Sequence, residues 1–303
     1  MAVDRVTTAY RAAATVARVL PGGLTDRLAE ALGAAATTVT PSRRFLVERN
    51  LRRALPDATD DDIARRVRQT FASYGRYYAE SFRLPSLTPS QIDAGMAYTG
   101  YEHVRRAVAQ GIGPILVQPH LGGWEWAAFW TTRLEGVPVC GVVEALEPPE
   151  LFEFFTELRS ALGMNVVPLG PRAGAEVLRA IRNAEVICLL MDRDIEGTGV
   201  EVEFFGERTT LPAGPATLAL RTGAPLLPAA MYFRGRGHHC VVRPPVPVER
   251  QGRLRDDVAR ITQVLAHELE DLIRVAPEQW HLMQPNWPSD HEALAAAGLG
   301  PPT

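Results

Sequence analysis

The stretch that decides the fold is residues 115–126, which read Ile-Leu-Val-Gln-Pro-His-Leu-Gly-Gly-Trp-Glu-Trp. An apolar run typical of a buried strand is followed by a proline, by His120 and, five positions later, by Glu125. In one continuous helix such positions lie about 140° apart and do not share a face. The proline and the two glycines instead allow a sharp turn between a strand and a helix. We therefore expect His120 and Glu125 to converge on one pocket.

Composition bounds the class of protein. The 303 residues are 46% hydrophobic, which is enough for a sizeable core in one large α/β domain or two small ones. The formal charge of −3 and the lack of a nucleic-acid-binding motif argue against nucleic acid as a partner. The three widely spaced cysteines favour a reducing compartment over a disulfide framework or a zinc site. We find neither a signal-peptide pattern nor an uncharged apolar run long enough for a transmembrane helix.

The chain divides into three parts by pattern. Residues 1–95 read as a helical N-terminal region that packs on the core, and both core packing and contact with a membrane surface fit its alanine-rich, mildly basic opening helix. From about residue 96, short apolar runs alternate with helices up to residue 290. This alternation predicts an α/β core with a central, mostly parallel β-sheet flanked by helices. Residues 291–303 read as a C-terminal tail of the same single domain.

Two polar clusters follow predicted strands. His120 comes just after the strand over residues 115–118, and Asp192-Arg193-Asp194 comes just after the strand over residues 186–191. Ligands of such sheets bind beyond the carboxyl ends of the strands. Both clusters are therefore expected at one edge of the sheet, which favours a chemical role for His120 over a structural one.

The residue types around His120 restrict the chemistry. A neutral imidazole with a carboxylate partner can take a proton from a hydroxyl whose oxygen attacks an acyl carbonyl. No Gly-x-Ser-x-Gly elbow accompanies His120, so direct transfer fits better than a serine acyl-enzyme. The cluster also lacks paired metal-ligand spacing and a dinucleotide-binding fingerprint, and we expect no metal and no cofactor. The adjacent His238 and His239 are expected to be solvated in a turn.

Several motifs of the chain occur together in a known family. His120-x4-Glu125 stands in the context Gln-Pro-His-Leu-Gly-Gly-Trp-Glu. The further matching segments are residues 192–194, 199–206, 211–225 and 277–287. With these motifs, which cover roughly residues 40–290, the sequence resembles the lysophospholipid acyltransferase superfamily, in the branch of bacterial lipid A late acyltransferases and mycobacterial phosphatidylinositol mannoside acyltransferases.

The resemblance implies transfer of a fatty acyl group from acyl-CoA, or else from an acyl carrier protein, to a hydroxyl of a membrane glycolipid. Phosphatidylinositol mannoside is the favoured acceptor. His120 would be the general base, and Glu125 takes the acidic position of the motif, either as the direct partner or behind it. In this branch a second acid pairs with the histidine, and Asp194 is the first candidate, followed by Asp192 and Glu201.

Other charged residues are candidates for binding substrate. Glu144 and Arg159 match positions that line the acceptor groove of the family, although solvated charges on a loop and a helix are the alternative. With Asp192, Arg193 and Glu201 they complete the set of expected substrate-binding residues. The aromatic side chains of residues 124–130 would either line an acyl tunnel or pack in the core.

The expected partners are acyl-CoA as co-substrate, the glycolipid acceptor and a membrane surface. We expect a monomer attached peripherally to the cytoplasmic face of the plasma membrane. Two rival functions fit the same residues. One is a thioesterase or other hydrolase that gives the acyl group to water, and the other is a glycolipid-binding protein with a degenerate site.

Overall fold

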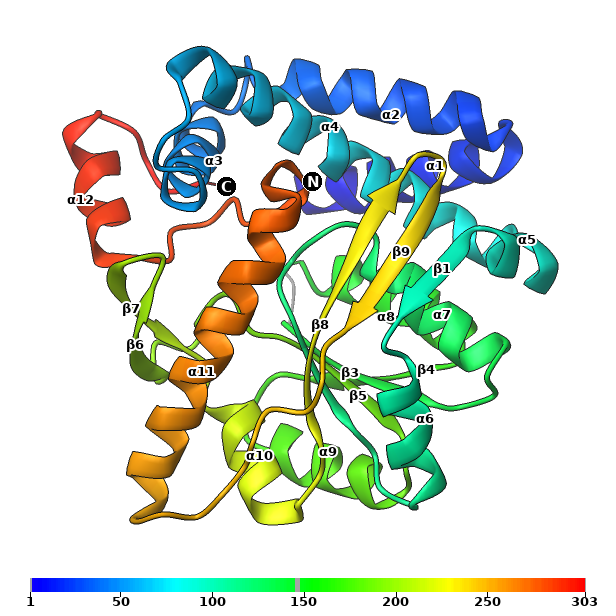
Figure 1. The fold of residues 1–303 in the computed structure, drawn as a ribbon. Helices are drawn as coiled ribbons and strands as arrows, with labels where there is room; N and C mark the ends of the chain where they lie inside the picture. The colour runs from blue at the N-terminus through cyan, green and yellow to red at the C-terminus, as the bar shows by residue number, and fades with distance from the viewer. Residues whose placement is uncertain (1, 145–147, 303) are drawn as a thin grey trace.

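The centre of the molecule is a seven-stranded sheet of order β1-β9-β8-β2-β5-β3-β4 (Figure 1). The structure, a computed structural model, describes residues 2–144 and 148–302, with the backbone alone for residues 2–6. Strands β8, β2, β5, β3 and β4 run parallel, β9 runs antiparallel to β8, and β1 pairs parallel with β9. The strands are β1 (Met96–Thr99), β2 (Ile115–Gln118), β3 (Val139–Val143), β4 (Met164–Pro168), β5 (Val186–Leu190), β8 (Leu226–Arg234) and β9 (Gly237–Val242). The predicted mostly parallel sheet is confirmed.

The position of β2 between two hydrophobic cores explains the unbroken apolar run of residues 115–117. Ile115 and Val117 point into one hydrophobic core, and Leu116 points into the core on the opposite face. A strand that is buried on both faces needs an unbroken apolar run rather than alternation. The first core is covered by α9 (Ala173–Arg182), α10 (Gly214–Thr222) and α11 (Leu254–Val275), and the second by α5 (Pro89–Ala94), α6 (Glu102–Ala109) and α7 (Trp124–Arg133).

The N-terminal helices lie across the end of the sheet at which the parallel strands finish, beyond the arrowhead of β8 in Figure 1. They are α1 (Ala2–Val19), α2 (Gly22–Ala36), α3 (Pro41–Ala54) and α4 (Asp60–Arg83). Helices α2 and α4 pack so closely that a Cβ on Gly75 would stand 2.2 Å from the carbonyl oxygen of Ala29. Glycine is therefore required at this crossing. Helix α8 (Pro149–Ala161) packs on α1 and α4 through Phe154 and Phe155.

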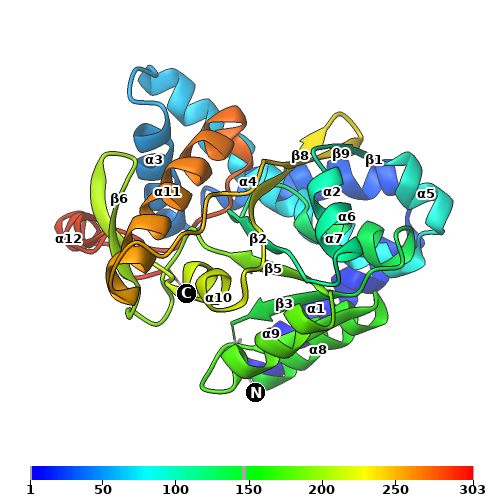
Figure 2. The same ribbon diagram turned by 60° about the horizontal axis from the view of Figure 1, so that its bottom comes forward.

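The hairpin β6 (Val200–Phe204) and β7 (Glu207–Leu211) forms a separate two-stranded sheet, as the alternating sequence there predicts. It lies beside α3, α11 and α12 (Pro288–Ala296) in both views of the molecule (Figure 2). Helix α12 occupies part of the segment that we expected to be a tail. It is held in place because Asp290 and Leu294 are buried. The described residues include no helix whose length and apolar character would let it cross a bilayer.

Two further features differ from the expectations. Strand β1 was not predicted, because it is a short edge strand whose side chains are mostly exposed and which therefore lacks an apolar run. His238 is not solvated: it is buried on β9, and its Nε2 lies 2.6 Å from Glu80 Oε2 on α4. The partner carboxylate lies 158 positions away in the chain, so no local pattern could have indicated it.

Candidate active site

His120 is placed by the turn between β2 and α7. Pro119 ends the strand, and Gly122 adopts a φ of 60° in the left-handed region, where a Cβ would stand 1.9 Å from the carbonyl oxygen of Met231. The chain therefore passes tightly against β8 before α7 begins at Trp124. This geometry leaves His120 at the carboxyl end of β2 with 35% of its side chain exposed.

Asp192 is the acid that contacts His120. Its Oδ1 lies 2.6 Å from His120 Nδ1, and its Oδ2 accepts a hydrogen bond of 3.0 Å from the backbone N–H of His120. The two residues meet because β2 and β5 are hydrogen-bonded neighbours whose register continues past the strands, where Met191 N–H donates to the Gln118 carbonyl at 2.9 Å. The prediction that the two clusters share one sheet edge is confirmed for this pair.

The environment of Asp192 keeps its carboxyl group ionised. The side chain is fully buried, and burial by itself would raise its pKa. The charge that His120 carries when it is protonated, and the hydrogen bonds that Asp192 accepts from His120 and Trp280, outweigh burial, so the pKa of Asp192 lies below its ordinary value. An ionised Asp192 can only accept, and we therefore assign the shared proton to His120 Nδ1. In the neutral form of His120, Nε2 then carries the lone pair that a general base needs.

The lowered pKa of Asp192 makes stability depend on pH in a defined direction. A carboxyl group whose folded pKa lies below its unfolded value stabilises the native state above the unfolded pKa, and this stabilisation is lost as pH falls through the folded pKa. We expect the free energy of unfolding to fall less steeply below about pH 4 in Asp192→Asn than in the unmodified protein. Urea unfolding at a series of pH values measures this, and identical slopes in the two proteins would contradict it.

A segment from the far C-terminal part of the chain completes the surroundings of the pair. The Trp280 indole N–H donates to Asp192 Oδ2 at 2.7 Å, and the Asn286 side-chain amide donates to the Asp192 carbonyl at 3.0 Å. The backbone N–H of His281 donates to the His120 carbonyl at 2.7 Å. Sequence reasoning used residues 277–287 only as a family match and gave these three no role. The only signal was a cluster of polar and aromatic residues directly after a long helix.

The His281 side chain closes the site toward α4. Its Nε2 lies 2.8 Å from Ser73 Oγ, and its ring contacts those of Tyr74 and Tyr77. Burial, together with the charge that nearby His120 carries when it is protonated, lowers the pKa of His281 to about 3. His281 is therefore a neutral imidazole at physiological pH and adds no positive charge beside His120.

Glu125 does not face His120 in the way that we expected. It lies in the first turn of α7, where its Oε1 forms a 2.8 Å ion pair with Arg159 and its Oε2 accepts a 2.6 Å hydrogen bond from the Ser81 hydroxyl. All of these groups are almost fully buried between α7, α8 and α4. Arg159 is thus neither solvated nor directed at the candidate base, and the motif's glutamate ties three helices together behind His120.

Asp194, our first candidate for the partner of His120, holds a loop instead. Its carboxylate accepts from the backbone N–H of Gly197 at 3.1 Å, from that of Gly199 at 2.8 Å and from the Thr210 hydroxyl at 2.9 Å. The prediction of Asp194 as the partner is therefore wrong in the structure, because the loop and the hairpin already use its oxygens. Asp192, the second candidate, takes that place.

The remaining candidates lie in two other places. Glu144 and Arg193 pair with each other at 2.7 Å, following β3 and β5 respectively. Glu201 lies on the β6–β7 hairpin with most of its side chain exposed, and its carboxylate lies 3.4 Å from the guanidinium of Arg208 rather than beside His120. The aromatic side chains Trp126, Phe129 and Trp130 of α7 pack in the core on the second face of the sheet.

The sequence of the chain is similar to those of known acyltransferases. A phosphatidylinositol mannoside acyltransferase of Mycobacterium tuberculosis H37Rv is 39% identical over 252 residues, which cover 80% of this chain and 77% of that protein. The protein of the same name from Mycolicibacterium smegmatis is 37% identical, covering 84% of this chain and 83% of its own length. A lipid A biosynthesis lauroyltransferase of Escherichia coli K12 is 27% identical, covering 86% and 84%. Residues 3–289 match the family described as bacterial lipid A biosynthesis acyltransferase. The chain belongs to this family of acyltransferases.

Proposed function

We propose that this acyltransferase moves a fatty acyl group from acyl-CoA to a hydroxyl of a membrane glycolipid, most favourably a phosphatidylinositol mannoside. The observation that carries the proposal is the 2.6 Å contact between His120 Nδ1 and the buried Asp192, with the His120 ring partly exposed at the sheet edge. The names of the mycobacterial relatives support the acceptor. The lipid A enzymes are more distant, and an acyl carrier protein is the alternative donor.

In the proposed mechanism, His120 Nε2 takes the proton of the acceptor hydroxyl as that oxygen attacks the thioester carbonyl. Asp192 holds the imidazole by its Nδ1–H and stabilises the imidazolium that forms. Collapse of the tetrahedral intermediate breaks the carbon–sulfur bond, and the imidazolium returns the proton to the departing thiolate. The products are the acylated lipid and free CoA, with no covalent acyl-enzyme.

Thiol release and lipid analysis together test this reaction. Purified protein is mixed with palmitoyl-CoA or palmitoyl acyl carrier protein, with and without phosphatidylinositol mannosides. We expect thiol release that depends on the glycolipid, together with an acylated product in the mass spectrum. Thiol release without glycolipid and without acylated lipid would instead identify a hydrolase. Lipid binding without thiol release from either donor would identify a binding protein.

We also propose that the protein meets the cytoplasmic face of the plasma membrane through α1 and α2. Leu24, Leu28 and Leu32 recur every fourth residue along α2 and are strongly exposed, and Val16 and Val19 of α1 are exposed beside them in the chain. A helical stripe of this kind, accompanied by exposed arginines on the same helices, suits the interface of an anionic bilayer. Helix α2 packs on α4, which borders the site through Ser73, so a membrane there would bring lipid close to His120.

A single charge in the stripe tests this surface. Leu32→Glu is expected to weaken binding to phosphatidylcholine–phosphatidylinositol vesicles by roughly tenfold, because it replaces an apolar side chain that would enter the interface. Val264→Glu places the same charge at an exposed aliphatic position on α11 and serves as the matched control. Vesicle sedimentation measures both, and equal binding of the two variants would contradict the proposed surface.

A further inference from the structure

The carboxylate of Asp192 is held from two sides. Oδ1 faces His120 Nδ1, whereas Oδ2 accepts both the His120 backbone N–H and the Trp280 indole N–H. Of these donors, only the Trp280 indole comes from outside the β2–β5 edge, and at 2.7 Å it makes the shorter bond to Oδ2. An indole is a donor only, so this contact fixes which way the carboxylate faces.

We propose that Trp280 is a positioning residue for acyl transfer, which orients Asp192 and through it the ring of His120. The inference rests on the proposed function of His120 as general base. The Trp280 indole N–H donates to Asp192 Oδ2 and not to the imidazole ring. Its effect on the reaction would therefore pass entirely through the Asp192 carboxylate.

Backbone contacts bring Trp280 to the site in a fixed register. Trp280 forms an antiparallel bridge with Leu121, the residue directly after His120. On either side, the Gly122 N–H donates to the Gln279 carbonyl at 3.0 Å and the His281 N–H donates to the His120 carbonyl at 2.7 Å. The turn that carries the base and the segment that carries the indole are thus joined as a short two-stranded pair.

Side-chain packing fixes the indole ring itself. Trp280 is 2% exposed, and its ring contacts Phe205 and Phe204 of the β6–β7 hairpin and Trp287. A ring enclosed on several sides cannot turn its N–H away without disturbing close-packed neighbours. The direction of the hydrogen bond to Asp192 is consequently set by the aromatic cluster.

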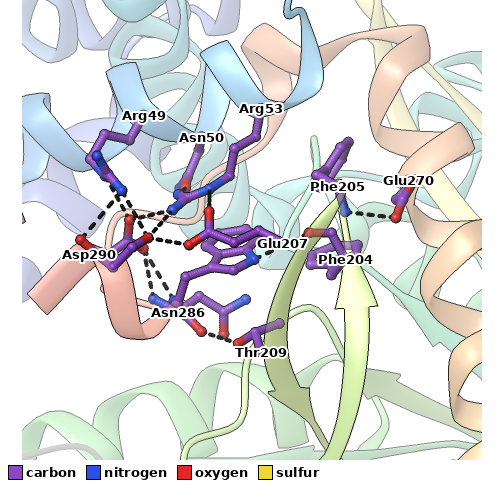
Figure 3. Close-up of polar contacts among 12 residues, drawn as sticks. Arg49, Asn50, Arg53, Phe204, Phe205, Glu207, Thr209, Glu270, Asn286 and Asp290 are labelled. Carbon is purple, nitrogen blue, oxygen red and sulfur yellow. Dashed lines mark hydrogen bonds and ion pairs between the residues drawn. The ribbon is translucent and has the colours of Figure 1, made fainter.

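The same segment is anchored again beyond the site. Asn286 donates to the Asp192 carbonyl, and its own backbone N–H donates to Asp290 Oδ2 at 3.1 Å. Asp290 is fully buried and binds Arg49 and Arg53 of α3, each at 2.8 Å (Figure 3). These contacts tie the chain on the far side of Trp280 to the N-terminal helices. Residues 279–286 therefore form a strap that is fixed at both ends and crosses the catalytic pair.

Trp280→Phe tests the proposal because it removes the N–H and keeps an aromatic ring. Hydrogen bonds to charged groups are strong, so we expect kcat to fall by about tenfold to a hundredfold with little change in KM. Loss of this donor also makes the Asp192 carboxylate a better acceptor for His120 Nδ1–H and so favours the imidazolium, and the acidic limb of the kcat/KM profile, which reports protonation of the base, should move to higher pH.

Trp130→Phe is the matched control. Trp130 is also a buried tryptophan whose indole N–H donates to an aspartate, but that aspartate is Asp93, at 2.9 Å, and the ring packs in the core on the second face of the sheet. We expect Trp130→Phe to lose stability and to keep the acidic limb of the unmodified protein. If the two variants shared one pH profile and one kcat, Trp280 would be a packing residue and the proposal would be overturned.

A spectroscopic comparison that keeps Trp280 in place covers the case in which Trp280→Phe does not fold. The Trp280 indole N–H resonance should shift between the unmodified protein and Asp192→Asn, whereas the Trp130 resonance should not. An unchanged Trp280 resonance would overturn the contact. This readout requires no turnover, so a failure of the proposed acyl transfer would be seen separately, as an unmodified protein that produces no acylated lipid.

Discussion

His120→Ala is expected to lower the rate of acyl transfer by about 10²–10⁴, the usual contribution of a general base. The variant removes the partly exposed imidazole that contacts the Asp192 carboxylate at the carboxyl end of β2. Because a third of the His120 side chain is exposed, we expect the fold to remain intact. Product formation from acyl-CoA and glycolipid, measured at saturating concentrations of both, gives the change in kcat.

An exposed histidine outside the site provides the control. His291 lies on α12, and His291→Ala should leave turnover unchanged. Near-normal turnover in purified His120→Ala would show that another group takes the proton. In that event the neutral His281, which lies next to the pair, would be the first residue to test.

Glu125→Ala is expected to lower the free energy of unfolding by about 3–5 kcal/mol. The substitution leaves the buried guanidinium of Arg159 without its carboxylate and the Ser81 hydroxyl without its acceptor. The charge that remains cannot be solvated between α7, α8 and α4. Urea unfolding of the variant and the unmodified protein at neutral pH measures the difference.

A surface ion pair provides the stability control for Glu125→Ala, and an activity measurement separates a structural role of Glu125 from a catalytic one. Glu201→Ala breaks an exposed contact with Arg208 and should change stability by only about 0–1 kcal/mol. In conditions where Glu125→Ala remains folded, we expect its kcat to exceed that of His120→Ala, because Glu125 supports the helices behind the base. A fully folded variant with the turnover of His120→Ala would instead make Glu125 a direct participant in the reaction.

Much of the fold follows from local patterns. The apolar run at 115–118, the proline and the two glycines predict the strand, turn and helix that the structure contains. The alternation after residue 96 likewise predicts the parallel strands. These features depend on burial and backbone geometry within a few residues. Strand β1 and helix α12 escaped prediction because their positions depend on pairing with β9 and on the burial of Asp290 by α3.

The identity of the acid shows where local reasoning ends. Asp192 and Asp194 follow the same strand two positions apart, and both have the charge that His120 needs. Asp194 is taken by the backbone N–H of Gly199 and by Thr210 on the hairpin. Asp192 is oriented by Trp280, which lies 88 positions further along the chain. No pattern around residue 192 contains this information.

The sequence by itself determined that His120 follows a buried strand at the carboxyl edge of a parallel sheet, because proline, glycine and apolar burial act over a few residues. It also determined that an acidic cluster lies at the same edge. Only the tertiary structure decided that Asp192 pairs with His120, that Glu125 binds Arg159, and that residues 279–286 fix the pair. These contacts join groups up to 161 positions apart, as between residues 120 and 281, and such groups meet only when burial of the whole core brings their elements together.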